Sequence, residues 1–143
     1  RIAPLIVFAV IIVSAYFINV EVQSNWGRQA LEKTGLVSYP LEQALEKARQ
    51  EKKRVLVDVS AIWCSTCRKL DNEIFADEEV KRNLNEKYIF ARLEYESEEG
   101  QKFLETHKAS GFPTLWVLDE KGNVIKRLRV TFDKHEFLWQ LNQ

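Results

Sequence analysis

Cys64 and Cys67 are the residues whose type and spacing most clearly could do chemistry. They stand in the stretch VDVSAIWCSTCRKLD, residues 57–71, and the chain has no other cysteine. Two thiols at this spacing allow three interpretations: a disulfide that stabilises the fold, half of a metal site, or a dithiol that exchanges electrons. A bridge that closes so short a loop removes little entropy from the unfolded chain, so a purely structural disulfide is the weaker interpretation.

A metal site would need more ligands than the two cysteines provide. Structural zinc commonly takes two Cys-x2-Cys pairs, or one such pair with two histidines. The two histidines, His107 and His135, lie far beyond Cys67 in the chain and lack the His-x3–5-His spacing. We therefore expect no metal site and interpret both histidines as solvated helix residues.

The segments around the cysteines are expected to place them between a strand and a helix. Residues 54–61, RVLVDVSA, are rich in β-branched and apolar side chains, which predicts a strand buried on both faces. Residues 68–75 continue as a helix. A cysteine in the first turn of a helix is favoured as the thiolate by the unpaired amides and the macrodipole. Cys64 could then attack a partner disulfide, and Cys67, one turn later on the same side, could resolve the mixed disulfide.

Beyond residue 40 the hydrophobic pattern predicts the element order α-β-α-α-β-α-β-β-α. Asp77 and Ser97 are the expected N-caps of two of the helices. Strands separated by helices favour parallel pairing, and a hairpin around a turn at 120–123 adds antiparallel strands to the same sheet. The expected fold class is therefore α/β, with a central mixed sheet flanked by helices.

The N-terminal segment differs from the rest of the chain. Residues 2–20 carry no charge, and 19 residues of helix reach about 28 Å, the thickness of a bilayer's hydrocarbon core. We interpret residues 1–20 as a transmembrane anchor, 21–40 as a polar linker and 41–143 as the folded domain. A cleaved secretory signal, with a small-residue site at 13–15, is the alternative. Because the chain begins with Arg1 and has no Met, we expect residues upstream, and the span could be the last of a larger membrane protein.

The composition is that of an ordinary folded protein. Hydrophobic residues make up 45% of the chain, and 21 basic residues balance 21 acidic ones without a basic block. Disorder and nucleic-acid binding are therefore not indicated.

These segments together resemble a known family. A strand ending in Asp, followed by Trp-Cys-x-x-Cys on a helix, is the thioredoxin pattern, here LVDVSAIWCSTCRKL, and GFPT at 111–114 fits as a second motif. The segments IFADEEVKRNL and GFPTLWVLDEKG are similar to the C-terminal, periplasmic thioredoxin-like domain of the DsbD thiol:disulfide interchange proteins. The resemblance covers residues 41–142. It implies a thioredoxin fold, and a preceding transmembrane span also fits DsbD.

The resemblance implies roles for individual residues. Cys64 would be the exposed nucleophile and Cys67 the buried resolving thiol. Pro113 would be a cis-proline whose backbone borders the cysteines and pairs with an extended substrate. Trp63 would pack beside the pair, although it could be an ordinary core aromatic. The residues expected to surround the reacting thiols are Trp63, Ser65, Thr66, Asp71, Phe112 and Thr114.

Two carboxyl groups near the cysteines are candidate proton carriers. Asp58 precedes Cys64 by six residues in a strand that otherwise looks buried. Burial without a partner should raise its pKa and let it accept the proton of the resolving thiol. It could instead sit at the strand edge and bond to backbone. Asp71 follows Cys67 by one helical turn, and either contributes to the same field or is a solvated helix residue.

The sequence departs from the family pattern at two places. Ile62 stands where relatives often have an acidic residue, so any electrostatic effect of that position is absent. Ser65 and Thr66 replace the Gly-Pro of thioredoxin itself. Because this pair helps to set the reduction potential, the direction of electron flow stays open.

The resemblance implies a membrane-tethered thiol:disulfide oxidoreductase on the bacterial inner membrane, with its domain facing the periplasm. Electrons would pass from a membrane partner to periplasmic protein disulfides, and cytochrome c maturation is one pathway it could serve. The dithiol is the electron carrier, so no cofactor is expected, and neither are a nucleic-acid partner or an oligomer. The alternatives are a disulfide oxidase or isomerase, and a non-enzymatic anchored adaptor or chaperone, including a copper-binding one.

Overall fold

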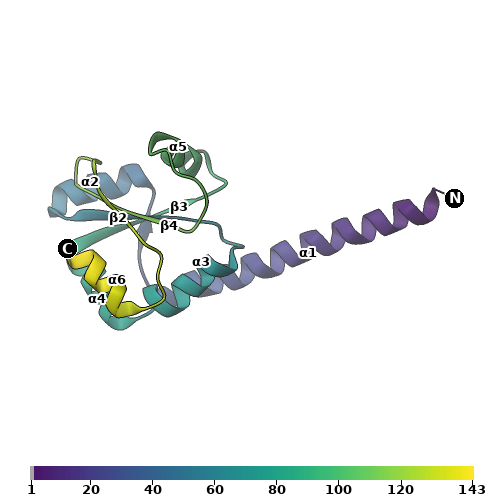
Figure 1. The fold of residues 1–143 in the computed structure, drawn as a ribbon, viewed down its shortest axis with the longest axis horizontal. Helices are drawn as coiled ribbons and strands as arrows, with labels where there is room; N and C mark the ends of the chain where they lie inside the picture. Colours follow the sequence, from purple (N-terminus) through teal and green to yellow (C-terminus); the bar gives the residue numbers. More distant parts are fainter. Residues whose placement is uncertain (1) are drawn as a thin grey trace.

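The computed structural model describes residues 2–143 as a five-stranded sheet between two layers of helices, with a long helix at the N-terminus (Figure 1). The helices are α1 (Ala3–Thr34), α2 (Leu41–Glu51), α3 (Ser65–Leu70), α4 (Glu78–Lys87), α5 (Glu98–Thr106) and α6 (Lys134–Asn142), with a π-helical turn, η1 (Asp71–Phe75), after α3. The strands are β1 (Ser38–Tyr39), β2 (Arg54–Ser60), β3 (Tyr88–Glu94), β4 (Thr114–Leu118) and β5 (Val124–Leu128).

The sheet has the strand order β1-β3-β2-β4-β5. β1, β3 and β2 run parallel, whereas β4 and β5 are antiparallel to their neighbours. The predicted mixed sheet is thus confirmed, and so is the order of elements after residue 40. β2 lies at the centre and is buried from Val55 to Ser60, as its continuous apolar run predicts.

Helices cover both faces of the sheet, as Figure 1 shows for α2 and α5 on one side and α4 and α6 on the other. Phe75 of η1 and Phe137 of α6 pack edge-on against each other within the first core, their ring centroids 5.8 Å apart. Phe103 of α5 packs with the alanines of α2 and with β-strand side chains in the second core. Burial of each such side chain contributes about 2 kcal/mol. The two cores hold in place the C-terminal end of β2, from which the chain leads into the cysteines.

The expected helix caps are present. The carboxylate of Asp77 accepts hydrogen bonds from the backbone N–H groups of Glu79 and Val80 at the start of α4. The hydroxyl of Ser97 accepts one from the N–H of Gly100 at the start of α5. Each pairing satisfies amides that a helix leaves without an internal partner.

The prediction of a polar linker over residues 21–40 differs from the structure. α1 continues as one helix to Thr34 and ends at Gly35, whose φ of +65° suits glycine. Residues 38–39 then form β1, which pairs with β3. The charged residues of this segment are exposed, whereas Ser24, Gly27, Ala30 and Thr34 form a buried stripe of small side chains.

The two halves of α1 have different surroundings. The large apolar side chains from Ile2 to Ile18 are more than half exposed, and Figure 1 shows this half projecting away from the domain. Within residues 2–143, α1 is the one helix long and apolar enough to cross a membrane. The second half packs against α3 and η1.

Candidate active site

Cys64 lies at the N-cap of α3, directly after the turn that follows β2. Its backbone is extended, with φ of −77° and ψ of 120°, and its Sγ accepts a hydrogen bond from the backbone N–H of Cys67 at 3.1 Å. Both cysteines are free thiols. The structure therefore places a donor on the sulfur that has to carry negative charge as a nucleophile, in the helix position that the sequence predicts.

Cys64 is far less accessible than the exposed nucleophile that the resemblance implies, because its side chain is only 7% exposed. Trp63, Tyr95 and Phe112 pack against the cysteines, and we call these three residues the aromatic rim. The ring of Phe112 lies 5.4 Å from that of Trp63 and 4.5 Å from that of Tyr95. Trp63 thus packs beside the pair, as predicted, and the rim narrows access to Cys64.

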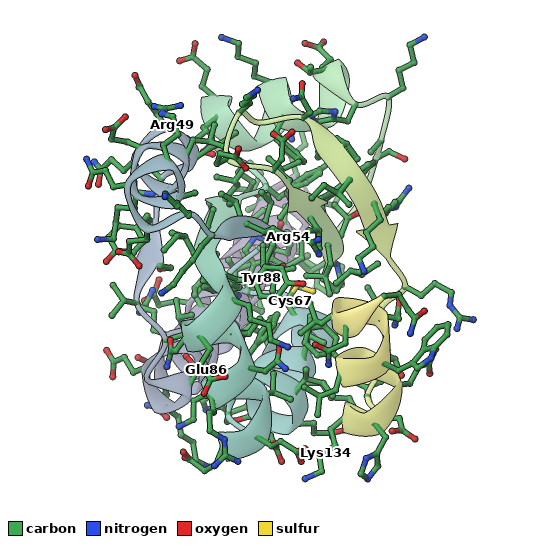
Figure 2. The ribbon with its side chains drawn as sticks, turned by 90° about the vertical axis from the view of Figure 1, so that its left-hand side faces the viewer. Arg49, Arg54, Cys67, Glu86, Tyr88 and Lys134 are labelled. Atoms are coloured by element: carbon green, nitrogen blue, oxygen red, sulfur yellow. The ribbon has the colours of Figure 1, made fainter. Side chains whose placement is uncertain are left out.

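Cys67 lies behind Cys64 in the interior of the domain, where it is 1% exposed. Figure 2 shows Cys67 near the middle of the domain, whereas Arg49 and Lys134 lie toward its outer edges. Burial raises the pKa of the Cys67 thiol, and the hydrogen bond with Cys64 and the charge of Asp58 raise it further. Cys67 is therefore a neutral thiol that has to lose a proton before it can attack.

Two buried carboxylates share one guanidinium on the side of Cys67. Nη1 of Arg92 lies 2.7 Å from Oδ1 of Asp71 and 3.3 Å from Oδ2 of Asp58. The hydroxyl of Ser60 donates to Oδ1 of Asp58 at 2.6 Å. The side chains of Asp58 and Asp71 are 0% and 1% exposed, so Asp71 is not a solvated helix residue.

The electrostatics of this cluster make its acids take up a proton more readily than exposed carboxyl groups do. Burial raises the pKa of both Asp58 and Asp71, and Arg92 offsets only part of that effect. The prediction that Asp58 has no partner is wrong, since Ser60 and Arg92 both contact it, but the expected direction of its pKa is correct. The reason is that one positive charge cannot compensate two buried negative ones.

Sequence reasoning missed Arg92. It stands in the strand YIFARLEYE, residues 88–96, at the register position paired with Asp58. A single arginine inside an otherwise apolar strand is a signal that could have revealed it, because a buried charge needs a partner. Two strands and η1 must come together before that partner is apparent.

Two glutamates at the end of β3 hold the turn that carries the cysteines. Oε1 of Glu94 accepts the backbone N–H of Ile62 at 2.7 Å, and burial raises the pKa of Glu94. Oε2 of Glu96 accepts the indole N–H of Trp63 at 3.4 Å. Both glutamates were also missed, and they supply acidic groups near Ile62.

The loop before β4 completes the surroundings of the cysteines. The peptide bond between Phe112 and Pro113 is cis, as the resemblance implies. Thr114 begins β4, is buried, and pairs with Val59 of β2, which brings this loop next to the turn. The remaining predicted residues, Ser65 and Thr66, are exposed on the first turn of α3.

The histidines lie outside this site. His107 is half-buried at the end of α5, with its ring tilted against Phe103 and Trp116 at centroid distances of 4.4 and 5.5 Å, so it is less solvated than the sequence predicts. His135 is exposed on α6.

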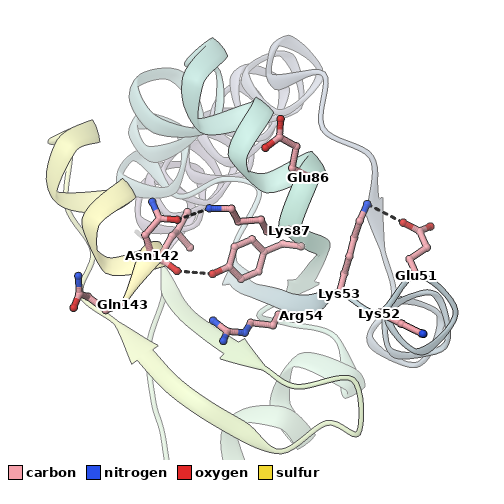
Figure 3. Close-up of a pocket in the computed structure, with 10 residues that line it drawn as sticks. Glu51, Lys52, Lys53, Arg54, Glu86, Lys87, Asn142 and Gln143 are labelled. Atoms are coloured by element: carbon pink, nitrogen blue, oxygen red, sulfur yellow. Dashed lines mark hydrogen bonds and ion pairs between the residues drawn. The ribbon is translucent and has the colours of Figure 1, made fainter.

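A cavity of about 480 Å³ lies away from the cysteines, at the start of β2, where Arg54, Lys87 and Asn142 line it (Figure 3). The cysteines follow the opposite end of that strand.

Fold and site together define a class of protein: a dithiol protein with a mixed sheet, a Cys-x-x-Cys pair at a helix start and a cis-proline loop beside it. The family model described as thioredoxin-like matches residues 37–120. The chain belongs to the thioredoxin-like family, which is a family of disulfide oxidoreductases.

Individual relatives agree with this assignment. The thiol:disulfide interchange protein DsbD of Yersinia pestis (strain Pestoides F) is 32% identical over 97 residues, which are 66% of this chain and 16% of that protein. The chain thus spans about a sixth of the length of the curated relatives it matches. A thioredoxin from Thermus thermophilus is 26% identical with a TM-score of 0.68, over 75% of this chain and 85% of that one.

The C-terminal domain of Neisseria meningitidis DsbD in its oxidised form shares the fold. Its TM-score is 0.57 at 21% identity, over 75% of this chain and all of that domain.

Proposed function

We propose that the chain is a membrane-anchored protein-disulfide reductase, in which Cys64 attacks and Cys67 resolves. The observation that carries the proposal is the pairing of the two thiols at the start of α3, with Sγ of Cys64 accepting the Cys67 N–H and a neutral Cys67 thiol behind it. A dithiol in this arrangement needs no further electron carrier.

The proposed reaction has two exchanges. The thiolate of Cys64 attacks one sulfur of a protein disulfide, forming a mixed disulfide and releasing the other substrate sulfur as a thiolate, which takes up a proton. Cys67 then loses its proton and attacks Sγ of Cys64. This step forms the Cys64–Cys67 disulfide and releases the second substrate sulfur. In total, two electrons and two protons pass to the substrate.

We assign Asp58 as the acceptor of the Cys67 proton. Its charge acts on Cys67, and burial raises its own pKa, so it takes up a proton more readily than an exposed carboxylate does. Asp71 and Arg92 would set how readily it does so. The extended substrate would lie along Pro113 and the aromatic rim.

The anchor is proposed from α1. Its apolar half is exposed on all sides, and such a helix is stable in an apolar environment rather than in water. Together with the likeness to DsbD, this favours an inner-membrane location with the domain in the periplasm, and a membrane protein as the electron donor.

Insulin reduction by the full chain in detergent tests the activity. We expect turnover by the wild type when dithiothreitol regenerates the dithiol, and none above the uncatalysed rate by Cys64→Ser. Without dithiothreitol, Cys67→Ser should accumulate the mixed disulfide. Equal activity of wild type and Cys64→Ser would contradict an enzymatic role and favour an adaptor.

A redox titration against glutathione tests the direction. A potential near that of thioredoxin, about −270 mV, supports reduction, and one near that of DsbA, about −120 mV, contradicts it.

A further inference from the structure

The second half of α1 is part of the active-site structure. A Cβ atom built on Gly27 would collide with the carbonyl oxygen of Ile62, so the backbone of α1 lies directly against the turn before Trp63 and Cys64. On the other side of that turn, the guanidinium of Arg68 donates to Oε1 of Gln23 at 2.7 Å. The contact between helix and turn is therefore made by backbone and by a specific hydrogen bond.

Arg68 makes a second contact with α1. Its guanidinium lies over the ring of Trp26, 5.2 Å from the ring centroid. Because α1 is one uninterrupted helix from Ala3 to Thr34, these contacts leave no flexible segment between the apolar half and the domain. The position of the dithiol is thereby fixed relative to the span.

The distance from the span to the cysteines is short. Seven residues separate Val20, the last of the apolar segment, from Gly27, which is about 10 Å along a helix. Each headgroup layer of a bilayer is roughly 5–8 Å thick. An anchored α1 therefore holds the turn of Ile62 just outside the headgroups, and closer to the bilayer if the helix tilts.

A groove of about 290 Å³ joins the span to the active site. Trp63 and Glu96 line one wall, and the other wall is α1 from its apolar end onward, formed by Tyr16, Asn19, Val20 and Gln23. Figure 1 shows the turn between β2 and α3 at the side of the domain from which the free half of α1 projects. One wall of the groove is thus an active-site tryptophan, and the other lies at headgroup depth.

We propose that α1 holds the dithiol rigidly at the bilayer surface, and that the groove between α1 and Trp63 receives the surface segment of a membrane-embedded protein whose disulfide lies at the outer boundary of the headgroup layer. This proposal rests on the proposed function. Asn19 and Gln23, whose amides hydrogen-bond each other at 3.4 Å, make part of this wall polar, while Tyr16 and Val20 continue the apolar surface of the span. A water-soluble partner would have to displace headgroups to enter the same groove.

Two synthetic single-span peptides in liposomes with the pre-reduced full chain provide the test. One carries a disulfide-closed loop two residues beyond its span, and the other carries the same loop beyond a flexible spacer of 20 Gly and Ser residues, about 25 Å on average. We expect the first disulfide to be reduced at least about tenfold faster. Equal rates for the two peptides would overturn the proposal.

Variants test whether the faster reduction of the first peptide depends on the contact between α1 and the turn of Ile62. In Gly27→Leu the new side chain collides with Ile62, so this variant should reduce the two peptides at equal rates. Gln29→Leu, on the exposed face of α1, should keep the faster reduction of the first peptide. A four-residue Gly-Ser insertion between Val20 and Glu21 leaves the contacts of Gln23 and Gly27 with the domain in place, but the distance of the domain from the bilayer is no longer fixed. This variant should also reduce the two peptides at equal rates, with insulin reduction unchanged.

The outcomes separate the two proposals. If the wild type reduces neither insulin nor either peptide, the proposed function is wrong. If it reduces insulin and the insertion variant retains the wild-type ratio between the peptides, the proposed function stands and rigid positioning is wrong. The insertion variant decides the matter even if Gly27→Leu fails to fold.

Discussion

Asp58 and Arg92 occupy paired positions on the parallel strands β2 and β3, and their side chains meet with Nη1 3.3 Å from Oδ2. The same nitrogen lies 2.7 Å from Oδ1 of Asp71. Two acids thus share one guanidinium beside a thiol that has to lose its proton. Because the second negative charge has no counter-charge, the cluster can take up a proton, and this is the property that resolution by Cys67 requires.

Arg92→Met should destabilise the folded protein strongly at neutral pH. It removes the guanidinium that contacts both buried carboxyls, and breaking a buried ion pair costs about 3–5 kcal/mol. Urea denaturation measures the loss. Arg82→Met, on an exposed position of α4, is the matched control and should change the free energy of unfolding by less than about 0.5 kcal/mol. Equal effects of the two variants would contradict a charged cluster in the core.

Asp58→Asn should change how stability depends on pH. Burial raises the pKa of Asp58, so its ionisation costs more free energy in the folded than in the unfolded protein. The stability that this group contributes is complete below about pH 4 and is lost as the pH rises through the raised pKa. The wild type should therefore lose more stability between pH 4 and 8 than Asp58→Asn does, as urea denaturation would show.

Asp119→Asn is the control for this sign. Hydrogen bonds from Asn123 lower the pKa of Asp119, so its contribution to stability is present above about pH 4 and is lost on acidification.

In the insulin assay, Asp58→Asn should also slow turnover roughly a hundredfold, the usual contribution of a general base. If Asp58→Asn reduced insulin at the wild-type rate, Asp58 would not be the proton acceptor.

The two thiols should differ in their reaction with iodoacetamide. Cys64 has access to solvent through the aromatic rim, whereas Cys67 is 1% exposed and its pKa is raised by burial. At pH 7.5, Cys67→Ser should be alkylated roughly 100-fold faster than Cys64→Ser, and the difference should vanish in urea. Mass spectrometry of timed samples gives both rates. Comparable rates in the folded variants would contradict the assignment of attacking and resolving thiols.

The sequence was sufficient for the features that depend on local pattern. The continuous apolar run of β2, the caps at Asp77 and Ser97 and the position of Cys64 at a helix start all follow from neighbouring residues. The long helix α1 was missed beyond residue 20 because its second half has many polar residues and a glycine, Gly27. Its buried stripe of small residues becomes meaningful only when α3 and η1 lie against it.

The electrostatic part of the site could not be predicted in the same way. Arg92 meets Asp71 only because β3 pairs with β2 and η1 covers that face of the sheet. The low exposure of Cys64 likewise depends on Tyr95 and Phe112, which come from two segments distant in the sequence. Such relationships require the tertiary structure, whereas the resemblance supplied the cis bond of Pro113.

Phe112→Ala should open the aromatic rim. The ring of Phe112 contacts both Trp63 and Tyr95, so its removal uncovers the side of Cys64 that they enclose. Alkylation of Cys64 in the Cys67→Ser background should accelerate about threefold to tenfold, as expected for a thiol limited by access. Insulin reduction should slow at low substrate concentration, because the substrate loses an aromatic contact worth about 1 kcal/mol.

Phe132→Ala provides the matched control for the rim. Phe132 lies just before α6, is half-buried against the first core with Lys69 over its ring, and is not among the side chains packed around the cysteines. Its removal should leave the alkylation rate of Cys64 unchanged. If both variants accelerate alkylation equally, general loosening of the domain explains the effect. If neither does, the rim does not limit access, and the low exposure of Cys64 has to be relieved by motion of the turn itself.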